Sequence, residues 1–326
     1  MSDTHVSPRE SSPAPAPVTP RFRGVIPPVV TPFRPSGAID HGALAALVEH
    51  LIGAGVDGVF ALGSSGEAAY LSDTHREAVL TTVVGTVGGR VPVLAGCLEA
   101  TAPRVSDQAR IAARVGADAL VATAPFYAMN DEAEIADHFR RIRSAVELPL
   151  FAYDIPLRVR VKLGAEMLVG LGREGVLTGV KDSSGDEAGF RMLVLANREA
   201  GSPLSVFTGQ EVVCDAALMV GADGLVPGLA NVDAEGYVRL WRAAGQQDWQ
   251  AARSEQERLA DLMRIARVAG HRSVDARGIG AFKAAMAHLG LLPSATMADP
   301  VQQLTEDEAA GVRAIVDRSR RPDVTP

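Results

Sequence analysis

Hydrophobic and polar positions alternate with two different periods from Gly24 onward. Short apolar runs rich in β-branched residues predict strands, and longer segments between them carry apolar residues at helical spacing, as in Leu44-Leu47-Val48-Leu51 and Ile135-His138-Phe139-Ile142. Eight strands are predicted in this way: Val25–Val30, Gly58–Leu62, Val91–Cys97, Ala119–Thr123, Leu148–Ile155, Val176–Asp182, Leu204–Gly209 and Gly224–Pro227. Such an alternation of strands and helices is typical of an α/β fold with a parallel sheet.

One pattern, Gly-Xaa-Asp, recurs where a predicted helix gives way to a strand. It occurs at Gly55-Val56-Asp57, Gly116-Ala117-Asp118 and Gly221-Ala222-Asp223. Glycine at such a place allows the helix to end in a left-handed conformation. Recurrence of one connection over roughly 250 residues favours a closed (β/α)8 TIM barrel over an open doubly wound sheet. The open sheet stays an alternative, although Val30-Thr31-Pro32-Phe33 occupies the place of its usual glycine-rich turn.

Three regions are predicted along the chain. Residues 1–22 form a disordered or extended tail, because five prolines among Ser and Ala leave too little apolar surface to offset the entropy of ordering. Residues 23–245 form the catalytic barrel. Residues 246–326 form a C-terminal helical region, with helices predicted over Trp249–Val268, Gly278–Leu289 and Thr305–Ser319.

Composition narrows the classes of protein that fit. The net charge of −7, with no clustered basic stripe, argues against a nucleic acid or an anionic membrane surface as a partner. Cys97 and Cys214 make no metal-ligand or disulfide pattern and are predicted to be buried fillers in a reducing compartment. No apolar stretch is as long as a membrane helix, and the N-terminus lacks the pattern of a signal peptide. We expect a cytoplasmic protein.

A single lysine stands out as a candidate for chemistry. Only three lysines occur beside 29 arginines, and Lys181 closes the apolar run Val176–Val180. Burial at a strand end disfavours an ammonium and so favours the neutral amine, which can attack a carbonyl and form a Schiff base. The alternative interpretation is a lysine that extends to the surface or pairs with Asp182.

The ends of other predicted strands carry further polar groups, and the carboxyl ends of barrel strands are where active sites lie. Gly63-Ser64-Ser65-Gly66-Glu67 offers hydroxyls and backbone N–H groups for an anion. Its alternative interpretation is a turn whose serine caps the next helix. Tyr127 and Tyr153 follow two other strands, and each has an alternative as a packing or interface residue.

These residues, in this order, resemble a known family. Gly63–Glu67, Tyr127, Tyr153-Asp154-Ile155-Pro156 and Gly179-Val180-Lys181-Asp182 are similar to the motif set of the dihydrodipicolinate synthase / N-acetylneuraminate lyase family of class I aldolases, over about Arg23 to Pro293. The resemblance implies an eightfold barrel without metal or organic cofactor. It also implies a lysine that forms an imine with pyruvate or another 2-oxo acid, which then reacts with an aldehyde.

The resemblance assigns a role to each matching residue. Lys181 would be the nucleophile and Tyr153 the proton shuttle, with Ser64 passing protons to Tyr153. Tyr127 would reach into a neighbouring subunit's site, which implies a homodimer or homotetramer. Ser65, with the backbone N–H groups of Ser64 and Ser65, would hold the 2-oxo acid carboxylate, and the substrate-binding set further includes Arg158, Gly209 and Val226.

Departures from the family pattern leave the acceptor open. In the synthases an arginine after the tyrosine motif binds the carboxylate of aspartate semialdehyde, and Arg158 has its place within Leu157-Arg158-Val159-Arg160. Asp154 replaces the commoner asparagine, and the residues after Lys181 are like those of sugar-acid aldolases. We interpret Arg158 as a carboxylate ligand, with pairing to a nearby acid as the alternative. Lys162 and Lys283 have ordinary surface or packing interpretations.

Three functions remain. The first is a pyruvate-dependent lyase or synthase, dihydrodipicolinate synthase-like, or alternatively an aldolase or dehydratase of 2-keto-3-deoxy sugar acids or an N-acetylneuraminate lyase-like aldolase. The second is a pyridoxal phosphate enzyme, for which Thr208-Gly209-Gln210 and Pro227-Gly228-Leu229 offer only weak phosphate-binding material. The third is a 2-oxo acid sensor without catalysis. The intact set Lys181, Tyr153, Tyr127 and Ser64 favours the first.

Overall fold

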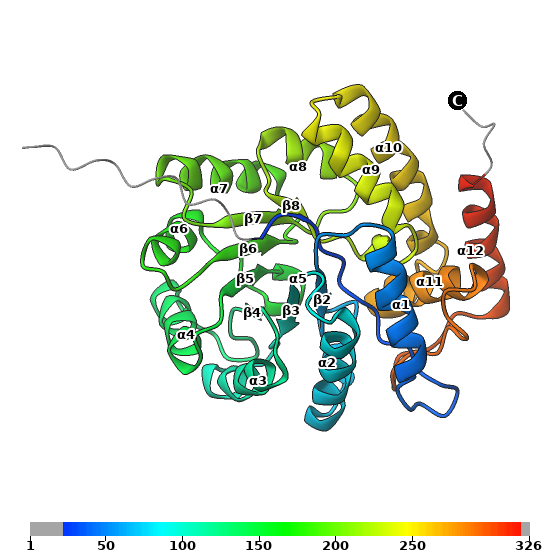
Figure 1. Cartoon of the computed structure of the whole chain (residues 1–326), viewed down its shortest axis with the longest axis horizontal. Helices are drawn as coiled ribbons and strands as arrows, with labels where there is room; N and C mark the ends of the chain where they lie inside the picture. The colour runs from blue at the N-terminus through cyan, green and yellow to red at the C-terminus, as the bar shows by residue number, and fades with distance from the viewer. Residues whose placement is uncertain (1–21, 321–326) are drawn as a thin grey trace, which may run out of the picture.

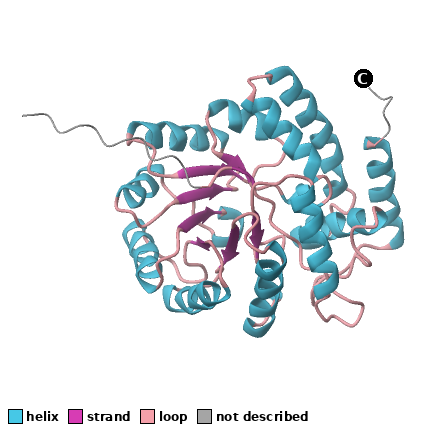
Figure 2. Ribbon diagram, in the orientation of Figure 1, coloured by secondary structure: helices cyan, strands magenta, loops and turns pink. Residues whose placement is uncertain are grey.

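The computed structural model describes residues 22–320 and contains one eight-stranded parallel sheet surrounded by helices (Figures 1 and 2). The order of the strands is β1-β8-β7-β6-β5-β4-β3-β2. Their bounds are Gly24–Val25, Val59–Ala61, Val93–Gly96, Ala119–Thr123, Leu150–Asp154, Gly179–Asp182, Ser205–Thr208 and Gly224–Leu225 for β1 to β8. Each lies within or at the edge of its predicted run. The predicted α/β TIM barrel is confirmed.

The segment after β1 closes the ring between β8 and β2. The Ile26 N–H donates to the carbonyl oxygen of Leu225, and the Val29 N–H donates to that of Phe60, at 2.8 and 2.9 Å. Regular pairing of β1 is nevertheless shorter than predicted, because Pro27 and Pro28 have no N–H to extend a ladder. The open-sheet alternative is therefore wrong.

The three Gly-Xaa-Asp connections have the predicted conformation, and they also have a function that the prediction missed. Gly55, Gly116 and Gly221 have φ of +88°, +97° and +109°. The aspartate of each connection then accepts the N–H at or beside the start of another strand, at 2.8–2.9 Å: Asp57 from Val25, Asp118 from Val93 and Asp223 from Val206. Each connection thus ends a helix and ties two strands together on the amino-terminal side of the barrel.

Helices cover the outside of the sheet. Helices α1 to α9 span His41–Gly53, Asp73–Val87, Ala102–Val115, Glu132–Ala145, Pro156–Val159, Ala165–Arg173, Glu187–Glu199, Cys214–Val220 and Ala234–Gly245, with short 3-10 helices η1 at Ala68–Tyr70 and η2 at Gly228–Asn231. Helix α4 illustrates why they form. Asp131 and Glu134 make a capping box at its start, and the predicted stripe Ile135, His138, Phe139, Ile142 is buried against the sheet.

Three further helices follow the barrel and lie at one side of it (Figure 1). They are α10 (Trp249–Leu262, continued by the 3-10 helix η3, Met263–Arg267), α11 (Val274–His288) and α12 (Glu306–Ser319). All three predicted helical segments are present. Helix α11 begins four residues before its predicted start because the Ser273 hydroxyl caps it by accepting the Ala276 N–H. Helix α11 contacts η2, so it reaches the barrel near the end of β8.

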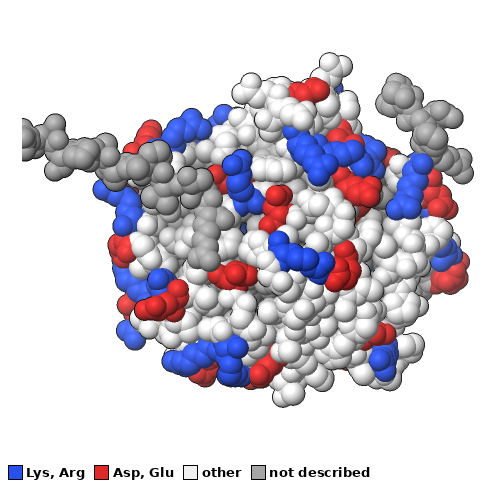
Figure 3. Space-filling model, in the orientation of Figure 1, with Lys and Arg blue, Asp and Glu red and all other residues white. Residues whose placement is uncertain are grey.

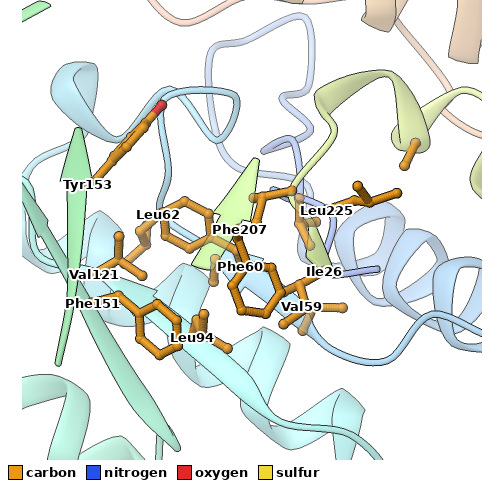
Figure 4. Close-up of a cluster of buried hydrophobic side chains, with 14 of the residues drawn as sticks. Ile26, Val59, Phe60, Leu62, Leu94, Val121, Phe151, Tyr153, Phe207 and Leu225 are labelled. Atoms are coloured by element: carbon orange, nitrogen blue, oxygen red, sulfur yellow. The ribbon is translucent and has the colours of Figure 1, made fainter. Parts of the chain in front are cut away.

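The barrel interior is a packed core, shown in Figure 4. Phe151 and Phe207 meet edge to face with ring centroids 5.9 Å apart, and Phe60 meets Tyr153 in the same way at 6.4 Å. Tyr153 lies at one end of this cluster, and its hydroxyl oxygen points away from the other labelled side chains. The apolar side chains of the barrel interior therefore lie on one side of the Tyr153 ring, and its hydroxyl points toward the strand ends that carry the polar groups.

The predicted tail, residues 1–22, lies outside the described residues except for Phe22. Phe22 is buried, and its ring meets that of Phe151 at 5.2 Å, so this residue packs against the barrel core. No helix of residues 22–320 is long and apolar enough to cross a membrane. Acidic and basic side chains are intermixed on the face in Figure 3. Cys97 and Cys214 are buried thiols, as predicted.

Candidate active site

Strands β5 and β6 place Tyr153 and Lys181 side by side. The two residues are register partners in this parallel pair, so their side chains leave the sheet on the same face. The Lys181 ammonium lies 4.0 Å from the centroid of the Tyr153 ring and 5.1 Å from that of Phe60. Lys181 is 6% exposed, and within residues 22–320 it forms no ion pair with a carboxylate. The alternative pairing of Lys181 with Asp182 is wrong, because Asp182 pairs with Lys162.

The Tyr153 hydroxyl has a polar neighbour and a shifted pKa. It lies 3.4 Å from the Ser64 hydroxyl oxygen, so these two predicted site residues meet across 89 positions of sequence. Burial by itself raises the pKa of Tyr153. The positive charge of Lys181 and hydrogen bonds from Ser64, Lys181 and Ser183 outweigh burial and lower that pKa below its usual value. The phenol is therefore a better proton donor than a tyrosine in water.

The loop Gly63–Glu67 is a tight turn whose last residue is fixed by contacts with the C-terminal region. Glu67 has a left-handed backbone, with φ of +56°, and its buried carboxylate pairs with the Lys283 ammonium and accepts the Ala298 N–H at 2.8 Å. The capping alternative for Ser64 and Ser65 is wrong, since the Ser72 hydroxyl caps α2. The surface interpretation of Lys283 is also wrong. Its buried ammonium, on α11, binds Glu67 and so ties the serine loop to this helix.

Gly209 packs directly against Lys181. A methyl group built on Gly209 would lie 3.1 Å from Cε of Lys181 and 2.1 Å from the Ser183 hydroxyl oxygen, so a side chain does not fit there. Val226 follows β8 and is buried. A methyl group on Gly228 would lie 3.2 Å from the Ser65 hydroxyl oxygen, which places Ser65 beside the start of η2.

Glu211 is a site residue that our sequence reasoning missed. Its carboxylate accepts the Leu229 N–H at 2.5 Å and lies close enough to Lys181 to feel its charge. Burial raises the pKa of Glu211 to about 6, against the opposing effects of the Leu229 and Gly228 N–H groups and of Lys181. The available signal was an acid two residues after the predicted seventh strand, at the carboxyl end of the barrel.

Arg158 is held by an acid from the C-terminal helices. Both terminal nitrogens of its guanidinium donate to the carboxylate of Asp275 on α11, one of them at 3.3 Å. The Tyr70 hydroxyl donates to the same carboxylate at 2.7 Å. Burial raises the pKa of Asp275, but these donors and the charge of Arg158 outweigh burial and lower it. Carboxylate pairing, the alternative interpretation of Arg158, is therefore realised within the chain.

Tyr127 does not enter the site of its own chain. Its side chain is fully exposed, its backbone has φ of +72°, and Met129 beside it is equally exposed. Two large, fully exposed side chains on one loop form a small apolar patch, and such patches often mark interaction sites. Lys162 lies at the surface, in line with one of its two predicted interpretations, and its ammonium also pairs with the buried carboxylates of Asp154 and Asp182. Among residues 22–320 no cluster of three or more metal-ligating side chains occurs.

The fold and the site define a (β/α)8-barrel enzyme whose polar groups gather at the carboxyl ends of its strands. Residues 21–319 match the model of the Dihydrodipicolinate synthetase family, and the chain belongs to this family, whose members include lyases. A 4-hydroxy-tetrahydrodipicolinate synthase of Phenylobacterium zucineum is 33% identical over 91% of this chain and 97% of its own. An uncharacterised DapA-like lyase of Halobacterium salinarum is 35% identical over 90% and 92%.

Solved structures of the same family superpose closely. YagE, a prophage protein of E. coli K12 determined in complex with pyruvate, has a TM-score of 0.87 and 27% identity over 92% of this chain and 99% of its own. A dihydrodipicolinate synthase of Bacteroides thetaiotaomicron has a TM-score of 0.86 and 28% identity over 92% and 100%. The family resemblance inferred from the motifs is thereby confirmed, and so is the prediction of a lyase-type enzyme.

Proposed function

We propose that this protein is a pyruvate-dependent lyase or synthase that forms a Schiff base between Lys181 and a 2-oxo acid. The observation that carries the proposal is the position of the Lys181 amine, buried at the end of β6, 4.0 Å from the Tyr153 ring and without an ion-pair partner in the described chain. Because no carboxylate holds it, this amine is available to attack a carbonyl. The pyruvate bound to YagE supports pyruvate as the 2-oxo acid.

Proton transfer is assigned to Tyr153 and Ser64. The amine first adds to the ketone carbon of pyruvate, and the resulting carbinolamine must lose its hydroxyl as water. The Tyr153 phenol, with its lowered pKa, donates the proton that this step needs. The Ser64 hydroxyl, 3.4 Å away, relays protons to and from the phenol.

The carboxylate of the 2-oxo acid is assigned to the serine loop. Ser65 and the backbone N–H groups of Ser64 and Ser65 supply preorganised donors, because Glu67 and Lys283 hold the loop in one conformation. Gly209 leaves room beside Lys181, and Val226 contributes an apolar contact for the methyl end of pyruvate.

Two reactions are consistent with this chemistry, and they differ in the molecule that reacts with the pyruvate imine. Relatives named 4-hydroxy-tetrahydrodipicolinate synthase support aspartate semialdehyde, with Arg158 as the ligand of its carboxylate. The pairing of Arg158 with Asp275 favours the second candidate, cleavage or formation of a 2-keto-3-deoxy sugar acid. The Arg158–Asp275 pair offers guanidinium donors and carboxylate acceptors to hydroxyl groups, and little net charge to a second carboxylate.

We further infer that the enzyme acts as a homodimer or homotetramer in the cytoplasm. The exposed Tyr127 supports an oligomer, because its own chain leaves the ring uncovered and a neighbouring subunit could bury it and use its hydroxyl in the proton relay.

The central test is chemical trapping. Treating the protein with pyruvate and borohydride should add one reduced pyruvyl group per chain, and peptide mapping should locate it on Lys181. Lys181→Ala should abolish the adduct while the protein stays folded. An adduct on Lys162 or Lys283, or no adduct in the wild type, contradicts the proposed function.

A further inference from the structure

Two carboxylates and one lysine form a cluster directly behind the proposed catalytic pair. Asp154 follows Tyr153 and Asp182 follows Lys181, and the two acids are register partners on β5 and β6. Because successive residues of a strand point to opposite faces, the acids lie on the helix side of the sheet while Tyr153 and Lys181 face the barrel. We refer to Asp154, Asp182 and Lys162 as the rear cluster.

The rear cluster has one partly exposed cation for two buried anions. The side chains of Asp154 and Asp182 are 0% and 4% exposed, and that of Lys162 is 35% exposed. The Lys162 ammonium donates to Oδ2 of Asp154 and, at 3.4 Å, to Oδ2 of Asp182. The remaining carboxylate oxygens accept the N–H groups of Leu163 and Ser184 at 3.2 and 2.8 Å. No other charged side chain of residues 22–320 forms an ion pair with either acid.

Resting on the proposed Schiff-base function, we propose that Lys162 is a positioning residue that ties the ends of β5 and β6 together and balances the negative charge behind Lys181. One ammonium bound to both acids fixes the spacing of the two strands one residue beyond Tyr153 and Lys181. Removing it leaves two carboxylates facing each other in a buried site, a costly arrangement. Burial and the neighbouring Asp182 raise the pKa of Asp154, and Lys162 opposes that rise.

A change in the net charge of the rear cluster should shift the pH dependence of imine formation at Lys181. The neutral amine of Lys181 is the reactive form, and added negative charge behind it favours the ammonium. Other ionisable groups that face Lys181 are Tyr153 on β5 and Glu211 after β7, and the variants below leave both unchanged. The pH at which imine formation reaches half its maximal rate therefore reports the charge of the cluster.

The experiment measures the rate of imine formation with pyruvate from pH 5 to 10 in four proteins, with samples quenched at timed intervals into borohydride at one fixed alkaline pH. With both acids ionised, the cluster has a charge of −1 in the wild type, −2 in Lys162→Met, 0 in Asp154→Asn and −1 in the double variant. We expect the half-maximal pH to rise by about one unit in Lys162→Met, to fall in Asp154→Asn and to return close to the wild type in the double variant. Arg173→Met, which removes an exposed charge at the end of α6, is the matched control and should leave the profile unchanged.

The outcomes separate this inference from the proposed function. A wild type that forms no adduct on Lys181 rejects both. An adduct on Lys181 with one common half-maximal pH in all four proteins rejects only the role of Lys162, even if Lys162→Met lowers thermal stability, because a merely structural residue would do that. A double variant shifted as far as Lys162→Met also rejects it.

Discussion

Arg158 and Asp275 are 117 positions apart in the sequence, yet the guanidinium of the first donates twice to the carboxylate of the second. Arg158 follows β5 and Asp275 lies in the first turn of α11, so the pair joins the proposed acceptor side of the site to the C-terminal helices. Tyr70 is the third member, through its hydrogen bond to Asp275. The pair would give the proposed acceptor site a nearly neutral, hydrogen-bonding character.

This pairing yields a prediction about specificity. Arg158→Ala and Asp275→Asn should each lower kcat/KM for a neutral polyhydroxylated aldehyde by roughly tenfold, which corresponds to one lost hydrogen bond of about 1.4 kcal/mol. Both should leave pyruvate trapping at Lys181 intact. The measurement compares glyceraldehyde with aspartate semialdehyde as acceptor.

The opposite pattern has a clear meaning. If Arg158→Ala impairs only aspartate semialdehyde, and Asp275→Asn improves it by releasing the arginine, then Arg158 binds a substrate carboxylate and the dihydrodipicolinate synthase-like reaction is correct. Thermal unfolding of Arg158→Ala is the control, because it leaves Asp275 without its cation.

Tyr153→Phe should separate proton transfer from binding. The substitution keeps the ring that contacts Lys181 and Phe60 and removes only the hydroxyl that lies beside Ser64. Turnover should fall by on the order of 10²–10⁴, with the fold and the KM for pyruvate largely retained. A rate constant equal to that of the wild type would show that the tyrosine has only a packing role.

If Tyr127 completes the site of a neighbouring subunit, two inactive variants should restore turnover when they are combined in one oligomer. In a shared site, Lys181→Ala lacks a nucleophile but still donates Tyr127, whereas Tyr127→Ala has the nucleophile and lacks the donated phenol. Mixed oligomers, formed by co-expression, should regain a fraction of wild-type turnover that neither parent shows. Light scattering should give at least a dimer for all the proteins. Absence of recovery in verified mixed oligomers, or a fully active monomer, contradicts a shared site.

Glu211 predicts a pH dependence of stability. Its pKa is raised on folding from 4.5 to about 6, so between these values the folded protein binds more protons than the unfolded chain. The free energy of unfolding should therefore fall as the pH rises from about 4.5 to 6, with a contribution of about 1–2 kcal/mol from this residue. Glu211→Gln retains an oxygen that can accept the Leu229 N–H, and should show a smaller fall.

Urea unfolding at pH 4.5 and 7.5, at equal protein concentration, measures the difference. The wild type should lose stability relative to Glu211→Gln at the higher pH. An identical pH dependence in the two proteins would mean that the Glu211 carboxyl is as well solvated in the folded state as in the unfolded chain.

Local chemistry in the sequence determined the elements and the central pair of the site. Apolar runs, helical periodicity and the left-handed glycines are properties of neighbouring residues, so strand and helix positions could be read from the chain. Parallel strands end on one side of a barrel, so polar residues at those ends had to converge. This geometry, with the family resemblance, is enough to predict that Lys181, Tyr153 and Ser64 lie together at one end of the barrel.

The tertiary structure alone decided which distant charges meet. Asp275 binds Arg158, Lys283 binds Glu67 across 216 positions, and Lys162 lies between two acids of adjacent strands. These pairings depend on how α11 packs on the barrel and on how the loop after α5 folds back. No local pattern encodes such a distance, because the entropy and desolvation costs of each pair are offset only when packing brings its members together.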